Sequence, residues 1–229
     1  MVTSAQEAVK DIQDGQTVLV GGFGCAGVPE SLCIALSKRN VKNLTMVSND
    51  CGLIDFGIGL NVKNNQVRRV IASYLGENHD IEHKFLNGEI EIELVPQGTL
   101  VEKCRAGGAG IPAFYTKTGV DTLVEEGGIP IKLGKFGWPT ISSKKKTRAT
   151  FNGVHYLRER AIVGDFALVR AWKADEAGNL LFRKAARNFN PDLAESGKIC
   201  IAEVEEIVPY GAIDPDMVHL PGVYVHRVV

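Results

Sequence analysis

The chain has 229 residues, of which 45% are hydrophobic and 23% are charged, and its formal net charge is -1. This composition is typical of an ordinary globular protein, and we expect a single domain over residues 1–229. The small net charge argues against broad attraction to nucleic acid or to an anionic membrane, and no apolar run is long enough to span a bilayer.

The cysteines indicate a reducing compartment. Five is an odd number, and no two of them have the C-x-x-C spacing of a zinc or redox motif. We therefore expect neither a disulfide framework nor a metal site.

The first predicted element is a short helix. Ser4 followed three residues later by Glu7 is a capping box, and Asp14-Gly15 ends the helix. Its apolar stripe consists of Ala5, Ala8, Val9 and Ile12.

The next stretch organises the chain as strand, glycine loop and helix. The apolar run 17–20 predicts a buried strand, and Pro29 suits the first position of a helix. The glycines between them let the backbone approach a ligand. Free N–H groups at the start of the helix would favour an anionic or thioester-bearing ligand. The helix has apolar residues on one face, at Val28, Leu32, Ala35 and Leu36.

The loop from Gly22 to Gly27 matches the pattern G-x-G-x-x-G. A nicotinamide or flavin site would place an acidic residue at the end of the second strand, where this chain has Asn49 with Asp50 just beyond it. A dinucleotide site therefore stays open but is not preferred. The same glycines are also compatible with a tight turn that has only a structural role.

Strands alternate with helices through the first half, which predicts an α/β fold with a largely parallel, helix-covered sheet. A second capping box, Thr99 with Glu102, predicts the start of another helix. The further predicted strands are 44–48, 67–73 and 90–95, with a helix at 80–86.

Polar side chains should gather at the carboxyl ends of these strands, where such sheets bind ligands. Asn49 and Gln97 are the candidate catalytic residues, because an amide can donate an N–H to a carbonyl oxygen that becomes negative. Considered alone, each could equally tie down its own turn. Residues 73–77 would lie beside them.

The second half is richer in strand. The glycine-rich, then aromatic stretch 105–115 could cover a site or cross to a partner, and Asn152-Gly153 predicts a hairpin turn. The segment 132–148 has no apolar period, so we expect it to be a flexible, solvated loop. The remaining predicted elements are strands at 166–171, 180–182 and 198–204 and a helix led by Asn190-Pro191.

Several stretches, in this order, closely resemble the A subunit of family I coenzyme A transferases, over nearly the whole chain. They are V-G-G-F-G at 20–24 with Gly27 and Pro29, V-S-N at 47–49, S-Y-L-G-E-N at 73–78, P-Q-G-T-L at 96–100, G-G-A-G-I-P-A-F-Y at 107–115 and F-R-K-A-A-R-N-F-N-P at 182–191.

The resemblance implies a ping-pong transfer through a glutamyl-CoA thioester. The nucleophilic glutamate of the family lies in a Ser-Glu-Asn-Gly motif of the B subunit, which this sequence lacks, so the chain would need a B subunit in a heterodimer or heterotetramer. Glu77 in Gly-Glu-Asn is expected to be structural. The CoA thioester would be a substrate, and no cofactor would be bound permanently.

The resemblance also assigns the site. It makes Asn49 and Gln97 contacts of the thioester or reacting carbonyl, and the glycine loop the CoA-binding signature. Cys25-Ala26 departs from the leucine and cysteine usual there. The CoA-binding residues would be Gly22, Phe23, Gly24, Cys25, Ala26, Gly27 and Val28.

Within the family, the resemblance is nearest to members that move CoA from succinyl-CoA to a 3-keto acid such as acetoacetate. A separate cytoplasmic chain and half of a fused mitochondrial enzyme both stay open. A non-catalytic sensor of acyl-CoA or a small anion is the alternative function, and an NAD-dependent oxidoreductase is a more distant one.

Overall fold

The computed structural model describes residues 1–229 except for the side chain of Lys135. Its centre is an eight-stranded sheet with the order β13-β12-β10-β1-β2-β3-β4, and β11 pairs with β10. Every pair along that order is parallel, and only β11 is antiparallel, so the predicted largely parallel sheet is confirmed. The strands are β1 (Thr17–Val20), β2 (Leu44–Val47), β3 (Val67–Ala72), β4 (Glu91–Leu94), β10 (Gly164–Asp175), β11 (Leu180–Leu181), β12 (Gly197–Val208) and β13 (Arg227–Val228).

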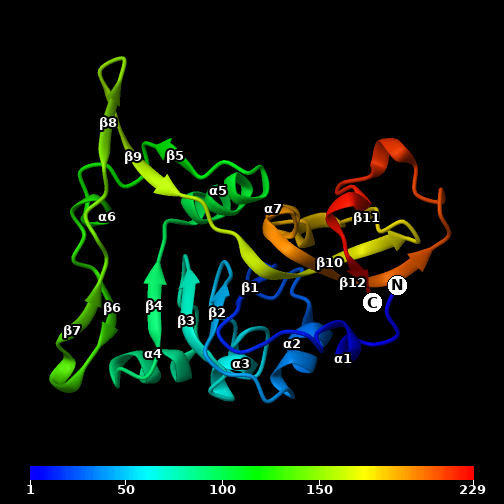
Figure 1. Ribbon diagram of the computed structural model, residues 1–229, viewed down its shortest axis with the longest axis horizontal. Coiled ribbons are helices and arrows are strands. Elements are labelled where there is room, and N and C mark those ends of the chain that lie inside the picture. Colours follow the sequence, from blue (N-terminus) through cyan, green and yellow to red (C-terminus); the bar gives the residue numbers. More distant parts are fainter.

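Helices cover both faces of this sheet (Figure 1). In β1, Val18 and Val20 belong to the apolar cluster on one face, and Leu19 belongs to the cluster on the other. Because both faces are buried, the strand is apolar throughout rather than alternating. Helices α1 (Ala5–Ala8), α2 (Glu30–Ser37), α3 (Gly59–Lys63) and α4 (His79–Leu86) cover the first face, and α5 (Gln97–Gly108) and α7 (Asn190–Ser196) cover the second.

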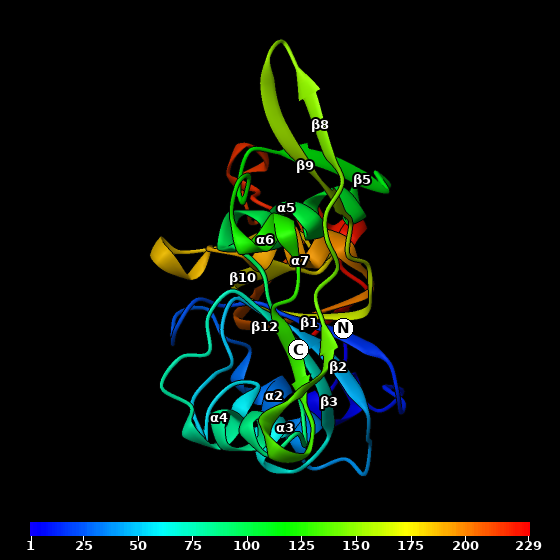
Figure 2. The same cartoon turned by 90° about the vertical axis from the view of Figure 1, so that its left-hand side faces the viewer.

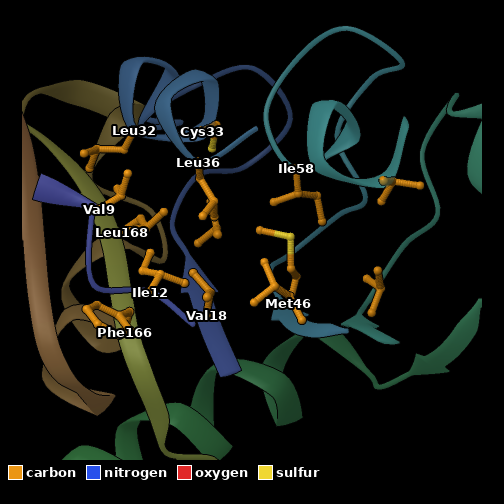
Figure 3. Packing of buried hydrophobic residues seen from close by; sticks show 14 of the residues in the cluster. Val9, Ile12, Val18, Leu32, Cys33, Leu36, Met46, Ile58, Phe166 and Leu168 are labelled. Atoms are coloured by element: carbon orange, nitrogen blue, oxygen red, sulfur yellow. The ribbon is translucent and has the colours of Figure 1, made fainter. Parts of the chain in front are cut away.

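The first cluster joins residues that are distant in sequence (Figure 3). Leu32 and Leu36 of α2 lie in the same cluster as Met46 of β2 and Leu168 of β10, and all four side chains are fully buried. The predicted apolar face of α2 therefore packs as expected, at the end of the glycine loop.

The two predicted capping boxes have different outcomes. Ser4 does cap α1, since its Oγ accepts the Glu7 N–H at 3.2 Å, but the Glu7 carboxylate accepts from Thr3 instead of Ser4. The capping box predicted at Thr99 is wrong. Helix α5 already begins at Gln97, because Pro96 is its N-cap and the Pro96 carbonyl accepts the first helical hydrogen bond.

In the glycine-rich stretch 105–115, two glycines serve packing. Gly107 and Gly108 lie in the last turn of α5, and a Cβ on Gly107 would lie 1.9 Å from the carbonyl oxygen of Ile162. A Cβ on Gly108 would lie 2.8 Å from Cβ of Glu195 in α7. The glycines therefore let α5 approach its neighbours closely, and the aromatic part continues into a strand.

That strand, β5 (Ala113–Thr116), pairs with β9 (Val154–Arg160), which pairs with β8 (Arg148–Phe151). The predicted hairpin turn is confirmed, with positive φ values of 50° at Asn152 and 76° at Gly153. The β8–β9 hairpin stands away from the sheet in both views (Figures 1 and 2).

The segment 132–148 is not an irregular loop. Strands β6 (Pro130–Leu133) and β7 (Pro139–Ser142) form an antiparallel hairpin, and the Lys146 N–H donates to the Glu125 carbonyl at 2.9 Å. The Lys146 ammonium pairs with the buried carboxylate of Glu159. Backbone pairing and an ion pair hold this segment, neither of which produces an apolar period. Its flexibility stays a prediction. The remaining elements are α6 (Leu123–Glu126) and four short 3₁₀ helices, η1 (Lys135–Gly137), η2 (Lys184–Ala186), η3 (Pro215–Met217) and η4 (Gly222–Tyr224).

Candidate functional site

A cavity of about 370 Å³ lies where the carboxyl ends of β1 to β4 meet. Strand β1 lies between β2 and the much later β10, so the connections diverge there, and such switch points are where open α/β sheets bind ligands. The lining residues are Phe23, Gly24, Cys25, Asn49, Asp50, Gly52, Leu53, Tyr74, Gly76, Glu77 and Gln97. The structure thus brings both predicted amides and the tip of the glycine loop into one hollow.

The glycine loop itself folds as a tight turn. Phe23 and Ala26 exchange two backbone hydrogen bonds of 3.0 Å, which places Gly24 and Cys25 at the tip. Gly22 has a φ of 116°, and a Cβ there would lie 2.6 Å from Cγ2 of Val28. Of the predicted CoA-binding residues, Phe23, Gly24 and Cys25 therefore line the cavity, while the others form the base of the loop.

The base of the loop is held by residues from the second half of the chain. Asn188 Nδ2 donates to the Ala26 carbonyl and Asn190 Nδ2 donates to the Gly27 carbonyl, each at 3.0 Å. The ring of Phe189 stacks on that of Phe23 at a centroid distance of 6.2 Å. The motif at 182–191 therefore supports the loop, a role that the sequence alone did not reveal.

The start of α2 is not open to an anion. The Leu32 N–H donates to Oε2 of Glu203 on β12 at 3.0 Å, and Arg170 lies 3.8 Å from the same carboxylate. Burial raises the pKa of Glu203 above its usual value. Since the chain places its own carboxyl group on this helix end, the expectation that the end binds an anionic ligand is wrong. A pyrophosphate bound as in a dinucleotide site would meet that group.

The two predicted amides are bonded to each other. Gln97 Nε2 donates to Asn49 Oδ1 at 2.7 Å, and Ser73 Oγ donates to the same oxygen at 3.0 Å. Asn49 is 4% exposed, whereas Gln97 is exposed at the start of α5. An amide nitrogen carries two hydrogens, so Gln97 keeps one N–H beyond its bond to Asn49. By the same count Asn49 Nδ2 keeps one N–H beyond its bond to Asp50, but of the pair only Gln97 is exposed.

Glu77 lines the same cavity, but its neighbours have structural roles. Asn78 caps α4, since its Oδ1 accepts the Ile81 N–H at 3.3 Å, and its Nδ2 donates to the Cys51 carbonyl at 3.1 Å. The Gly-Glu-Asn sequence is thus a turn that leads into a capped helix. Among the lining residues, which all lie in the described part of the chain, there is no lysine, arginine or histidine.

Sequence reasoning missed several contributors to the cavity. Asp50, Gly52 and Leu53 lie in the stretch that follows β2, whereas Tyr74, Gly76 and Glu77 fall in the stretch 73–77 that was expected beside the amides. The strand ends were the available signal, but which side chains turn inward depends on loops whose course the sequence pattern does not specify. Across the described residues, no helix is long and apolar enough to cross a membrane, and no group of three or more metal-binding side chains occurs.

Comparison with known proteins agrees with the earlier resemblance. The family model for coenzyme A transferase matches residues 2–229. The chain is 53% identical over 229 residues to the A subunit of a probable succinyl-CoA:3-ketoacid coenzyme A transferase of Bacillus subtilis (strain 168), covering 100% of this chain and 89% of that protein. It is also 53% identical over 223 residues to the human mitochondrial succinyl-CoA:3-ketoacid coenzyme A transferase 2, covering 97% of this chain and 43% of that protein.

A solved structure supports the same assignment. An acyl-CoA transferase from Escherichia coli O157:H7, in a thioester complex with CoA, superposes with a TM-score of 0.83 at 25% identity, covering 99% of this chain and 46% of that chain. The relative from Bacillus subtilis, the family model and the solved structure each match nearly the whole chain. The chain therefore belongs to the coenzyme A transferase family.

Proposed function

We propose that this chain is the A subunit of an enzyme that moves CoA from succinyl-CoA to a 3-keto acid such as acetoacetate. The named relatives support the substrate pair and the subunit type. The observation that carries the proposal is the Gln97–Asn49 amide pair, which lies beside the glycine loop in the cavity at the strand ends.

The proposed reaction follows the ping-pong scheme that the family resemblance implies. A glutamate carboxylate from the B subunit's motif attacks the thioester carbonyl and expels the CoA thiolate, which leaves an acyl-glutamyl anhydride. The thiolate then attacks the glutamyl carbonyl and releases succinate, which forms glutamyl-CoA. The 3-keto acid attacks this thioester, and the same two steps in reverse deliver CoA to it and restore the glutamate.

In this scheme, the chain described here supplies hydrogen bonds rather than the nucleophile. Negative charge develops on the carbonyl oxygen at each attack, and the remaining N–H of Gln97 would stabilise it. Asn49, which is buried and bonded to Gln97, would hold that amide in place. A neutral amide suits this task because it offers a donor without changing its own charge.

The partner would be a B subunit in a heterodimer or heterotetramer, and the enzyme would need no permanently bound cofactor. The relatives named as A subunits support a separate partner chain. We place the enzyme in the cytoplasm, in line with the bacterial relatives, although the matching human protein is named as mitochondrial.

The test is reconstitution. The chain and a B subunit that carries Ser-Glu-Asn-Gly would be assayed for transfer of CoA from succinyl-CoA to acetoacetate, separately and mixed. We expect activity only in the mixture, and the Glu77→Gln variant should remain active there. Activity of the chain alone, or trapping of the CoA intermediate on Glu77 by hydroxylamine, would contradict the proposal.

A further inference from the structure

Asp50 lines the cavity directly after Asn49 and has no role in the scheme above. We propose that Asp50 is a positioning residue that fixes the Asn49 amide and the glycine loop relative to each other, so that Gln97 presents its N–H to the substrate. This inference rests on the proposed function, because it concerns how the same site works.

Three donors from three different segments meet at the Asp50 carboxylate. Oδ2 accepts from Asn49 Nδ2 at 3.0 Å and from the backbone N–H of Gly24, at the loop tip, at 2.9 Å. Oδ1 accepts from the backbone N–H of Gly52 at 3.0 Å. The end of β2, the loop after β1 and the turn after β2 are therefore joined through one side chain.

The carboxylate also determines which way the Asn49 amide faces. An ionised carboxylate can only accept hydrogen bonds, so the nitrogen of Asn49 must point to Asp50 and its oxygen must point to Gln97 and Ser73. With the amide reversed, a nitrogen would face the Gln97 nitrogen and an oxygen would face the carboxylate. Both contacts would be unfavourable.

The orientation of Asn49 then determines the role of Gln97. Because Asn49 presents an oxygen, Gln97 must turn its nitrogen toward it, which sets the plane of the Gln97 amide and the direction of its second N–H. The charge on Asp50 should also polarise the Asn49 amide and strengthen its oxygen as an acceptor. Asp50 thus acts on the substrate only through Asn49 and Gln97.

Three N–H groups donate to this side chain, so it must offer acceptors only, which a carboxylate does. Asparagine could still accept at one oxygen, but its nitrogen would face a donor, either the Gly52 N–H or the pair formed by Gly24 and Asn49. We therefore expect Asp50→Asn to keep part of the arrangement and Asp50→Ala to lose all of it.

The experiment measures kcat and KM of the reconstituted complex for Asp50→Ala and Asp50→Asn, each with Gln97 intact and with Gln97→Ala. With Gln97 intact, Asp50→Ala should lower kcat about 10- to 100-fold, by analogy with the loss of outer hydrogen-bond partners of metal ligands, with a much smaller change in KM. In the Gln97→Ala background, Asp50→Ala should lower kcat only slightly further. Asp55→Asn is the matched control, since Asp55 is exposed and pairs only with Lys63 among the described residues.

The inference would be overturned if the fold-losses in kcat of Asp50→Ala and Gln97→Ala multiplied fully in the double variant. A change confined to KM would overturn it as well. If Asp50→Ala does not fold, the nearly isosteric Asp50→Asn variant supplies the same comparison, with a smaller loss expected. A wild-type complex without transferase activity would instead refute the proposed function, so the two failures are distinguishable.

Discussion

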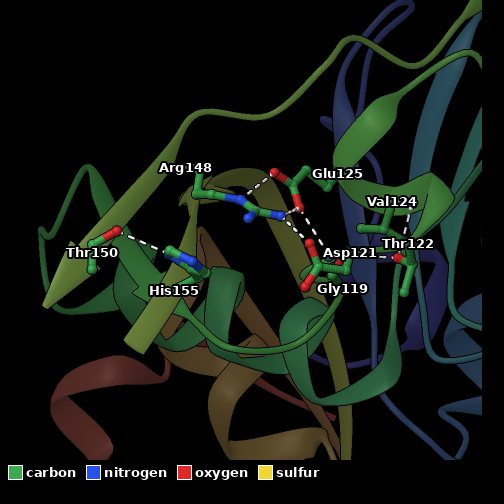
Figure 4. A network of polar contacts seen from close by, with 8 residues as sticks. All are labelled: Gly119, Asp121, Thr122, Val124, Glu125, Arg148, Thr150 and His155. Carbon is green, nitrogen blue, oxygen red and sulfur yellow. Dashed lines mark hydrogen bonds and ion pairs between the residues drawn. The ribbon is translucent and has the colours of Figure 1, made fainter. Parts of the chain in front are cut away.

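Two polar networks in this chain differ in the charge of the side chains that they expose. At the cavity, Asp50, Asn49 and Gln97 form a series of hydrogen bonds that ends on an exposed amide with an N–H to spare. Beside β8, Arg148 forms two hydrogen bonds of 2.6 Å to Glu125 and a further one to Asp121, and the Asp121 N–H also donates to Glu125 (Figure 4).

The difference separates a site from a structural clamp. In the second network, both oxygens of the buried Glu125 accept bonds from Arg148, and the exposed members are the charged side chains of Arg148 and Asp121, which pair with each other. In the first, the buried Asn49 is bonded to both Asp50 and Gln97, and the exposed member is the neutral amide of Gln97, which keeps one N–H. Spare hydrogen-bonding capacity at the end of a rigid series is what pre-organised stabilisation of a transition state requires.

Removing the exposed end of the first network should have the largest effect. Gln97→Ala should lower kcat about a hundred- to thousandfold, corresponding to about 2.7 to 4 kcal/mol of barrier, because one donor to the developing oxyanion is lost. Gln97→Glu should be worse, since it adds repulsion. Stopped-flow measurement of glutamyl-CoA formation in the reconstituted complex gives the comparison, with the exposed Gln6→Ala as control.

The rate of that step separates catalysis from binding. Because the bond strengthens as charge develops, the affinity for acyl-CoA should fall much less than turnover. If Gln97→Ala formed the intermediate at the wild-type rate and only bound acyl-CoA less tightly, Gln97 would be a binding residue. Asn49→Ala should resemble Gln97→Ala without adding fully to it, since Asn49 acts through the same amide.

Asn190, which supports the glycine loop, should be the next most sensitive residue. Asn190 is fully buried, donates to the carbonyls of Gly27 and Ala186 at 3.0 Å, and accepts the Arg170 N–H at 2.9 Å. Asn190→Ala leaves these buried groups unpaired, and we expect a loss of about 1–3 kcal/mol in the free energy of unfolding. Urea denaturation measures it.

A surface amide provides the contrast. Asn64 is exposed and donates to the Ser37 carbonyl, so Asn64→Ala should change stability by no more than about 0.5 kcal/mol. Equal losses in the two variants would mean that burial of Asn190 does not matter and that the loop is held by other contacts.

Much of the fold could be predicted because its pattern is local. The strand before the glycine loop, the apolar face of α2 and the Asn152-Gly153 turn depend on residues close in sequence, and all three are confirmed. Helix α5 was placed too late because Pro96 can cap a helix without a side-chain acceptor, so the serine-threonine rule did not apply.

The site could be predicted only as a meeting of strand ends. Parallel strands bring Asn49 and Gln97 to one edge of the sheet, and this follows from the α/β pattern alone. Asn190 can hold the loop, and Glu203 can cover the start of α2, because β10 lies beside β1 and β12 lies beside β10. Such long-range neighbours leave no periodic signal, so these partners had to come from the structure.

Chemical labelling distinguishes the cavity from the core. Cys25 is exposed at the loop tip, while the other four cysteines are buried, and burial raises the pKa of Cys51 to about 12. Native protein should therefore react with iodoacetamide at Cys25 alone, since the thiolate is the reactive form. Acyl-CoA should slow the reaction in the reconstituted complex. Mass spectrometry locates the label, and rapid labelling of Cys25→Ala would contradict the prediction.

Acid should weaken the second network, with a modest effect on stability. The hydrogen bonds from Arg148 hold the pKa of Glu125 at about 2, below its usual value near 4.5. A carboxyl group whose pKa is lower in the folded state stabilises that state above its unfolded pKa, and the gain is lost as the pH falls from about 5 to about 2. Glu125→Gln should therefore lower the Tm at pH 7 and flatten its fall with acid. Glu126→Gln is the control, because the Glu126 side chain is exposed and its loss should leave the profile as in the wild type. Thermal unfolding at pH 7, 5 and 3 gives the profiles, and equal acid sensitivity of Glu125→Gln and the wild type would show that this clamp does not contribute to acid unfolding.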